Sequence, residues 1–280
     1  MEQTALLLKS ELIDLDFKQP EKIKSKDLNQ LIEQMVNHIG STDPELRDKL
    51  IYTSFYYLIQ RDYLNEQQMT YLIETCLDEK HLFLSIGSQD DDTVFTRAFS
   101  SLVVALILGK DRENQFLSTE LTKRTIKCSM FYLQEETDTR GYVEGKGWAH
   151  SIAHGADLLD EAIKHPLFEM GIVNDCLDTI SSCLFKEAVY TDGEDERLIY
   201  SIEALLEKGM DERILEKWIF SLSDYLNEIR NPNGFSLSYF RKKTNLSNFL
   251  KTLYFRLMFK NDGVSTRKTI IEILETLHEN

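Results

Sequence analysis

The hydrophobic positions of this chain recur mainly at spacings of three and four residues, which is the repeat of one face of an α-helix. At Asp43 the pattern begins with an N-cap, followed by Pro44 in the first turn, where proline is well tolerated. We predict helices over residues 3–15, 27–38, 46–59, 65–77, 94–108, 121–133, 147–163, 173–184, 197–206, 214–229, 245–259 and 265–277. The pattern therefore predicts an all-α protein.

The last ten of these helices form five pairs that begin at intervals of about fifty residues, as in a helical-repeat array. The first helices of four pairs carry an arginine or a glycine at matching places near their starts, namely Arg47, Arg97, Gly147 and Arg197. We predict one helical domain over 1–280, with cap helices in 1–40 and stacked pairs in 43–280. A HEAT- or armadillo-like α-α superhelix is the first expectation, and a closed α/α toroid is the alternative.

Composition agrees with this prediction and narrows the choice of partners. The chain has only 4 prolines and 12 glycines, and 42% of its residues are hydrophobic, which suits long helices around a substantial core. Its net charge is −15. Binding to phosphate backbones needs clustered lysine and arginine, so this charge argues against nucleic acid and favours a basic partner.

The sequence also indicates a cytoplasmic protein without a membrane partner. Its start lacks the basic region and cleavage site of a signal peptide. The longest apolar run, 102–108, is far shorter than a membrane span. The cysteines form no CxxC pair and lie within helical patterns, so we predict buried free thiols in a reducing compartment: Cys76, Cys128, Cys176 and Cys183.

The stretch 140–159 differs from the rest of the chain because it combines glycines, histidines, a tryptophan and several charges. If a helix begins at Gly147, its apolar face is opposite a polar stripe of histidines and acids at helical spacing. The stripe consists of His150, His154, Asp157 and Glu161. We predict a polar pocket here, and its candidate residues are Arg140, Glu144, Trp148, His150, His154 and Asp157.

Two histidines at i and i+4 on a helix are a common arrangement for zinc ligands. His150, His154 and Asp157 are therefore a candidate set of ligands for a divalent metal. The glutamate of the HExxH motif is absent, since Ser151 follows His150. A pocket without metal and a solvated polar stripe remain alternatives, and no other cofactor is indicated.

Several short sequences in and around this stretch occur together in a known family. They are Asp138, RG at 140–141, GWAH at 147–150, AHGADLL at 153–159, DDTVFTR at 91–97, FS at 99–100, EDER at 194–197, FL at 249–250 and LYF at 253–255. In these segments the chain resembles the bacterial family called domain of unknown function 2785. The resemblance implies a largely helical protein whose activity is not established, and it carries over no catalytic residue.

Acidic residues recur where the first helices of the pairs begin. The candidates for an acidic rim are Asp91, Asp92, Asp138, Glu194 and Asp195. If the pairs stack in register, these residues line one edge, where they either cap helices or meet a basic peptide or a divalent cation. The segment 230–244 contains the one basic cluster in a long connector, at 241–243.

Two functions follow from these patterns. The first is a binding or scaffold protein with a polar pocket around 140–157 and a protein or small molecule as its partner. The alternative is a metal-assisted hydrolase with His150 and His154 as metal ligands, Asp157 as a third ligand or orienting group, and Glu144 or Glu161 as base.

Overall fold

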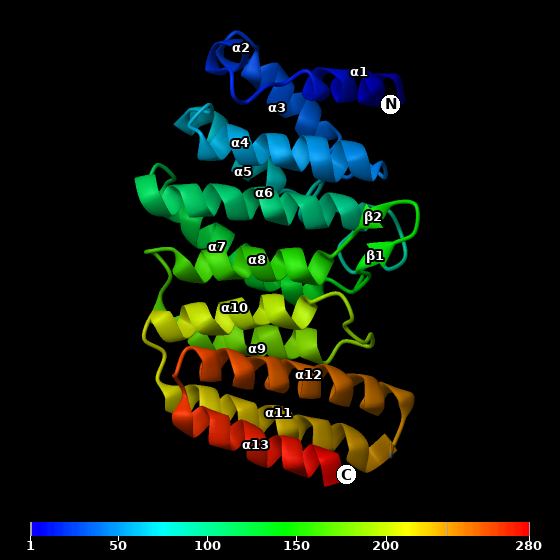
Figure 1. Ribbon diagram of the computed structural model, residues 1–280, viewed down its shortest axis with the longest axis vertical. Coiled ribbons are helices and arrows are strands. Elements are labelled where there is room, and N and C mark those ends of the chain that lie inside the picture. The colour runs from blue at the N-terminus through cyan, green and yellow to red at the C-terminus, as the bar shows by residue number, and fades with distance from the viewer. Residues whose placement is uncertain (1, 234, 280) are drawn as a thin grey trace.

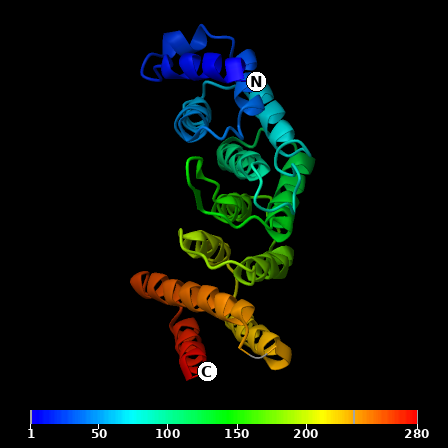
Figure 2. The same cartoon turned by 90° about the vertical axis from the view of Figure 1, so that its right-hand side faces the viewer.

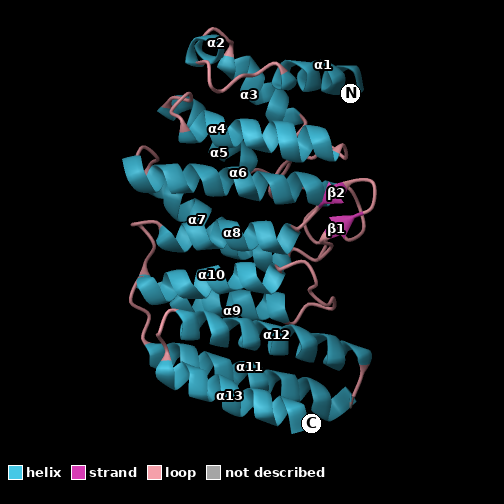
Figure 3. Cartoon of the chain, in the orientation of Figure 1, coloured by secondary structure: helices cyan, strands magenta, loops and turns pink. Residues whose placement is uncertain are grey.

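The computed structural model of the chain describes residues 2–233 and 235–279, and these residues are almost entirely helical (Figure 3). The elements are α1 (Glu2–Ile13), α2 (Pro20–Lys24), α3 (Leu28–Asn37), the π-helix η1 (Glu45–Tyr52), α4 (Thr53–Gln60), α5 (Glu66–Cys76), α6 (Thr93–Asn114), α7 (Thr119–Glu135), β1 (Tyr142–Val143), β2 (Gly147–Trp148), α8 (Ser151–Lys164), the 3-10 helix η2 (Met170–Ile172), α9 (Val173–Leu184), α10 (Glu194–Glu207), α11 (Glu212–Asn233), α12 (Leu237–Phe259) and α13 (Val264–Glu279). The predicted all-α class is confirmed.

The helices stack in two layers along one long axis, with the N-terminus at one end and the C-terminus at the other (Figure 1). Helices α4, α6, α8, α10 and α12 form one layer, while α5, α7 and α9 lie behind it (Figure 2). The stack is bowed, and the layer that contains α8 is on its hollow side (Figure 2). Because its ends are far apart, the array is open and the toroid alternative is wrong. The similarity of this fold to HEAT or armadillo arrays stays a prediction.

Helix α8 occupies the middle of the stack. It packs against α6 on one side, against α10 on the other, and against α7 behind it. Gly155 allows this close approach, since a Cβ there would lie 2.7 Å from side-chain atoms of Leu133 and Tyr132. Only residues that point between α6 and α10 toward the hollow side keep contact with solvent.

Two predicted segments needed correction. The helix predicted from Gly147 begins at Ser151, because Gly147 and Trp148 form the second strand of a short antiparallel hairpin. The predicted connector 230–244 is mostly helical: α11 runs to Asn233 and α12 starts at Leu237. Ser236 starts α12, since its Oγ accepts a hydrogen bond from the Tyr239 amide at 3.1 Å. The basic cluster at 241–243 therefore lies on a helix, and Gly234 of the expected turn lies outside the described residues.

The apolar character of α6 follows from its position in the core. By length and composition alone this helix could cross a membrane, but 78% of its most apolar window is buried within the protein. Three cysteines, Cys76, Cys176 and Cys183, are buried as predicted, and Cys128 is half-buried. All four are free thiols.

The arginines that recur at the starts of first helices have structural roles. Arg97 is fully buried and pairs with the equally buried Glu136, with Nε–Oε2 and Nη2–Oε1 distances of 2.7 and 2.9 Å. Arg97 Nη1 also donates to the Leu84 carbonyl at 2.9 Å and to Thr93 Oγ1 at 2.7 Å. It thereby joins the start of α6 to the preceding loop and to the end of α7.

Candidate functional site

The loops that precede α6, α8 and α10 lie along one edge of the array (Figure 1). The β1–β2 hairpin projects from this edge, and Tyr142 pairs with Trp148 across it. Polar contacts bind the loops together: Lys146 Nζ of the hairpin lies 2.6 Å from Asp92 Oδ1, and Arg140 Nη2 donates to the Asp91 carbonyl at 2.6 Å. Most acids of this edge are therefore engaged in local structure.

Arg47 holds the hairpin against the core of the protein. Its Nη2 donates to the carbonyls of Lys146 and Trp148 at 2.8 and 3.2 Å. Its guanidinium lies over the rings of Phe95 and Phe99, with its carbon 4.3 and 4.8 Å from their centroids. A buried arginine needs such partners because an unpaired buried charge is costly. The hairpin is thus fixed to the core rather than free at the surface.

His150 joins the hairpin to α8. It precedes the helix with a φ of 50°, in the left-handed region that non-glycine residues seldom adopt. Its ring stacks on Trp148 with the centroids 4.6 Å apart, and its Nε2 lies 2.9 Å from the Asp192 carbonyl oxygen. Because His150 lies before the helix, its ring turns toward the loop before α10 and not along α8.

Three of the four residues of the predicted polar stripe lie on α8, and the fourth, His150, precedes the helix. Within this helix only His154, Asp157, Glu161 and Lys164 are partly exposed, and all other residues are buried. The ring of His154 packs edge-on against Phe99 at 5.3 Å, and its Nδ1 is enclosed without a hydrogen bond. Burial, followed by the neighbouring His150, lowers the pKa of His154 from 6.5 to about 3. His154 is therefore a neutral side chain at physiological pH.

Two hollows flank the stripe, and we call them together the α8 grooves. One, of about 290 Å³, lies between α6 and α8 and is bordered by Tyr52 and Gln60. The other, of about 390 Å³, lies between α8 and α10. Asp157 and Asp160 line both. The linings contain six carboxylates and three basic side chains, and further basic residues outside the linings pair with Glu113, Glu203 and Glu207.

Most carboxylates in the α8 grooves have a basic partner. Asp157 pairs with Arg197 at 2.8 Å, Glu161 lies 3.1 Å from Arg112, and Asp160 Oδ2 lies 2.5 Å from Lys164. Burial nevertheless raises the pKa of all three carboxyls above its ordinary value and outweighs the lowering by these partners. Ionising them at neutral pH therefore costs stability.

One groove oxygen, Asp160 Oδ1, is enclosed and has no hydrogen-bond donor among the described residues. Asp160 is deeply placed, with 8% of its surface exposed. A buried carboxylate oxygen without a donor costs several times the value of an ordinary hydrogen bond. Sequence reasoning missed Asp160, because it lies outside the spacing of the polar stripe.

The predicted pocket residues are not gathered in one cavity. Glu144 is exposed at the hairpin turn, Trp148 is 41% exposed, and Arg140 lies in the loop before the hairpin, where it is tied to Asp138. His154 and Asp157 lie instead on the groove side of α8. The hairpin end and the groove are connected through His150, whose ring is 5.6 Å from that of His154.

The residues of the predicted acidic rim differ in how deeply they are buried. Asp91 accepts from the Thr93 amide at 2.8 Å and so caps α6, and Asp195 accepts from Thr252 Oγ1 at 3.4 Å. Asp138 and Glu194 are each 2% exposed and belong to the interior of the edge. An acidic edge is present, but much of its charge is capped, paired or buried.

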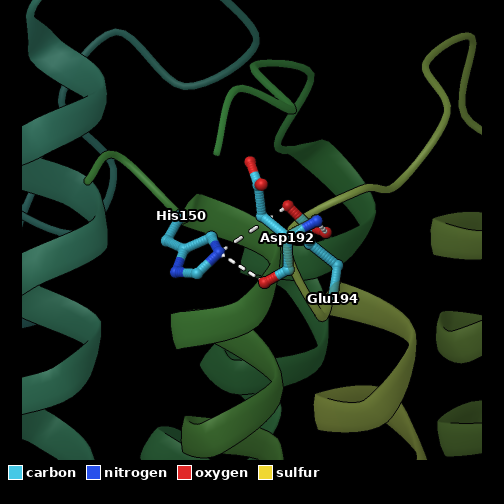
Figure 4. Close-up of side chains that lie close together, drawn as sticks. All are labelled: His150, Asp192 and Glu194. Carbon is cyan, nitrogen blue, oxygen red and sulfur yellow. Dashed lines mark hydrogen bonds and ion pairs between the residues drawn. The ribbon is translucent and has the colours of Figure 1, made fainter. Parts of the chain in front are cut away.

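The structure groups the metal-ligand candidates differently from the sequence prediction. Among the described residues, ligand atoms of His150, Asp192 and Glu194 lie within 4.8 Å of one another (Figure 4). His154 and Asp157 are outside this group: His154 is enclosed against Phe99, and Asp157 is paired with Arg197. The different backbone conformation at His150 accounts for the change of partners.

Comparison with known proteins gives one match. A family model described as "Protein of unknown function (DUF2785)" matches residues 82–255, more than half of the chain. The match spans α6 to most of α12 and includes the hairpin and the helices α6, α8 and α10 that border the grooves. No curated protein and no solved structure matches.

Proposed function

We propose for this chain, which belongs to the DUF2785 family of proteins of unknown function, a role as a binding protein whose α8 grooves receive a cationic side chain of a partner protein. The grooves border α8, whose layer forms the hollow side of the bowed stack (Figure 2), where a helical array offers an extended surface. Their excess of carboxylates and the net charge of −15 attract a basic partner.

The observation that carries this proposal is Asp160 Oδ1, an enclosed acceptor without a donor at the meeting of both grooves. Proteins seldom leave such a group unsatisfied, and exceptions concentrate where a ligand completes the site. A ligand that brings hydrogen-bond donors and positive charge would satisfy this oxygen.

An arginine side chain suits this site better than a lysine. Its planar guanidinium presents five donors in a fixed fork, and it is less strongly hydrated than an ammonium group. Asp160 and Glu161 are each held on one side by Lys164 and Arg112, so an incoming guanidinium meets carboxylates that are already positioned. Tyr52 and Tyr200 in the linings offer rings on which the guanidinium can stack.

The proposal predicts that an arginine-rich peptide binds the full chain and that Asp160→Asn weakens this binding at least ~10-fold, or about 1.4 kcal/mol. The reason is that the variant removes the charge and leaves the fold of α8 intact. The measurement is calorimetric titration at low and at physiological salt, with a lysine-rich peptide as comparison. Affinity should fall with salt, since charged contacts are screened.

The matched control is Glu74→Gln, which removes an exposed carboxylate on α5, in the other layer. This variant should bind the arginine-rich peptide as the wild type does. Equal weakening by Glu74→Gln and Asp160→Asn would mean that only net charge matters, and no binding to the wild type would refute the proposal.

A second prediction concerns stability. Burial raises the pKa of Asp160 in the folded protein. The protonated carboxyl therefore stabilises the fold below the unfolded-state pKa, and this stabilisation is lost as the pH rises through the folded-state pKa. Asp160→Asn should therefore unfold at higher denaturant than the wild type at pH 7, although it loses a charge pair with Lys164. The difference should shrink below about pH 4. A variant that is less stable at pH 7 would show that Asp160 is retained for stability and not for a ligand.

The metal-assisted hydrolase stays the alternative function. It depends on a metal held by His150, and the group of ligand atoms that favours it is His150, Asp192 and Glu194. A binding protein that uses the grooves does not require this metal, so the two ideas can be tested separately.

A further inference from the structure

We infer that His150, Asp192 and Glu194 form a site for a divalent transition metal, zinc or manganese, at the edge of the array where α8 and α10 begin. The site is distinct from the α8 grooves and does not depend on the proposed function. One imidazole nitrogen and two carboxylates are a donor set used for both ions in proteins.

The three side chains come from two segments that converge at this edge. His150 ends the hairpin segment, Asp192 lies in the loop before α10, and Glu194 is the first residue of α10 (Figure 4). The His150 Nε2–Glu194 Oε1 distance is 3.8 Å, and one ligand atom from each residue lies within 4.8 Å of the others. Ligand atoms around a tetrahedral zinc ion are about 3.3 Å apart. Small side-chain rotations therefore bring these groups to metal-binding distances.

The electrostatics of Glu194 point to a missing positive charge. Its side chain is 3% exposed, and among the described residues no lysine or arginine forms an ion pair with it. Glu194 Oε2 accepts the Asp192 amide at 2.9 Å, which holds the carboxylate in place without neutralising it. Two other buried carboxylates near this edge have arginine partners, Asp138 with Arg140 and Glu136 with Arg97. A divalent cation would give Glu194 and Asp192 the compensation that buried charges need.

The surroundings place the Asp192 carboxylate against the hairpin. Asp192 Oδ2 accepts the Tyr142 amide at 3.2 Å, and a Cβ at Gly141 would lie 1.8 Å from the same oxygen. Only glycine at 141 leaves room for the carboxylate in this position. On its other face the His150 ring is supported by Trp148, so all three candidate ligands are oriented by neighbouring groups.

Metal binding would change one hydrogen bond. His150 Nε2 now lies 2.9 Å from the Asp192 carbonyl oxygen, to which a protonated Nε2 donates. To ligate a metal through Nε2, the neutral imidazole must carry its proton on Nδ1 instead. The metal would then replace this single hydrogen bond by three ligand bonds, and it would clamp the start of α8 to the start of α10.

The test uses tag-free full-length protein, treated with chelator and then titrated with zinc or manganese. Bound metal is counted by elemental analysis after gel filtration, and affinity is measured by calorimetry against a competing chelator. We expect one ion per chain and a higher thermal midpoint when it is bound. His150→Ala and Glu194→Gln should each weaken binding more than ~100-fold, since even second-shell changes cost about 10–100-fold.

Two control variants distinguish this site from other possibilities. Glu196→Gln removes an exposed acid in the same first turn of α10, and His154→Gln removes the histidine of the sequence prediction. Both should bind metal like the wild type. If Glu194→Gln fails to fold, Asp192→Asn on the half-buried loop takes its place. The inference is overturned if the wild type binds no stoichiometric metal, or if Glu194→Gln binds metal with unchanged affinity. It is also overturned if His154→Gln loses the metal while Glu194→Gln keeps it.

Discussion

Arg97→Met should lower the free energy of unfolding by about 3–5 kcal/mol, because it leaves the Glu136 carboxylate buried without its partner. Both side chains are 0% exposed, and their two hydrogen bonds are 2.7 and 2.9 Å long. The variant also frees the Leu84 carbonyl, which Arg97 now binds at 2.9 Å. The measurement is urea denaturation at neutral pH.

The double variant Arg97→Met with Glu136→Gln should be less destabilised than the sum of the two single changes, because no charge is then left unpaired. A matched control is Arg213→Met, whose pair with Asp211 is exposed, with 81% and 44% of the two side chains accessible. Exposed ion pairs contribute little to stability, because water screens them and ordering the two side chains costs entropy. Similar losses for Arg97→Met and Arg213→Met would contradict the assigned burial.

Acidification from pH 6.5 to about pH 5 should cost the wild type roughly 2 kcal/mol of stability that His154→Gln does not lose. His154 has a folded-state pKa of about 3 against 6.5 for an ordinary histidine. Below pH 6.5 His154 is therefore protonated in the unfolded chain but not in the folded protein. The free energy of unfolding falls as the pH is lowered, until the folded-state pKa is reached. Above pH 6.5 both states are neutral and the slope disappears.

Most groups around His154 lower its pKa. Burial is the main cause, and His150, Arg197 and Arg47 add to it from the hairpin segment, α10 and η1, while a hydrogen bond to the Ala98 backbone on α6 opposes them. The measurement is denaturation of wild type and variant at several pH values in the presence of chelator. Proton NMR of the imidazole should show no titration of His154 between pH 7 and about pH 5. Parallel pH curves for the two proteins would contradict the account.

The helical stack could be predicted from the sequence because helix period and helix ends are local signals. The limits 173–184 agree with α9, and the exposed stripe of α8 follows the predicted spacing of His154, Asp157 and Glu161. The hairpin could not be predicted, since its strands of two residues are too short to show alternation. The glycines clustered in this stretch indicated a loop but not a hairpin.

The details of the candidate sites depended on contacts between distant residues. His150 lies 42 positions before Asp192, and they meet because a left-handed residue and the packing of α8 on α10 bring them together. The unsatisfied oxygen of Asp160 could not be predicted from the sequence either, because its burial depends on the neighbouring helices. The recurring Arg47 and Arg97 did mark important positions, but their role is to hold loops and not to bind a ligand.

We propose that the α8 grooves receive a cationic side chain. Carboxyl footprinting, in which a carbodiimide couples an amine to accessible acids, tests this most directly when the full chain is labelled with and without the arginine-rich peptide. We expect protection of Asp157, Glu161 and Glu207, which line the grooves, and unchanged labelling of Glu74 on the other layer. Protection of Glu74 with unchanged labelling of the groove acids would contradict it.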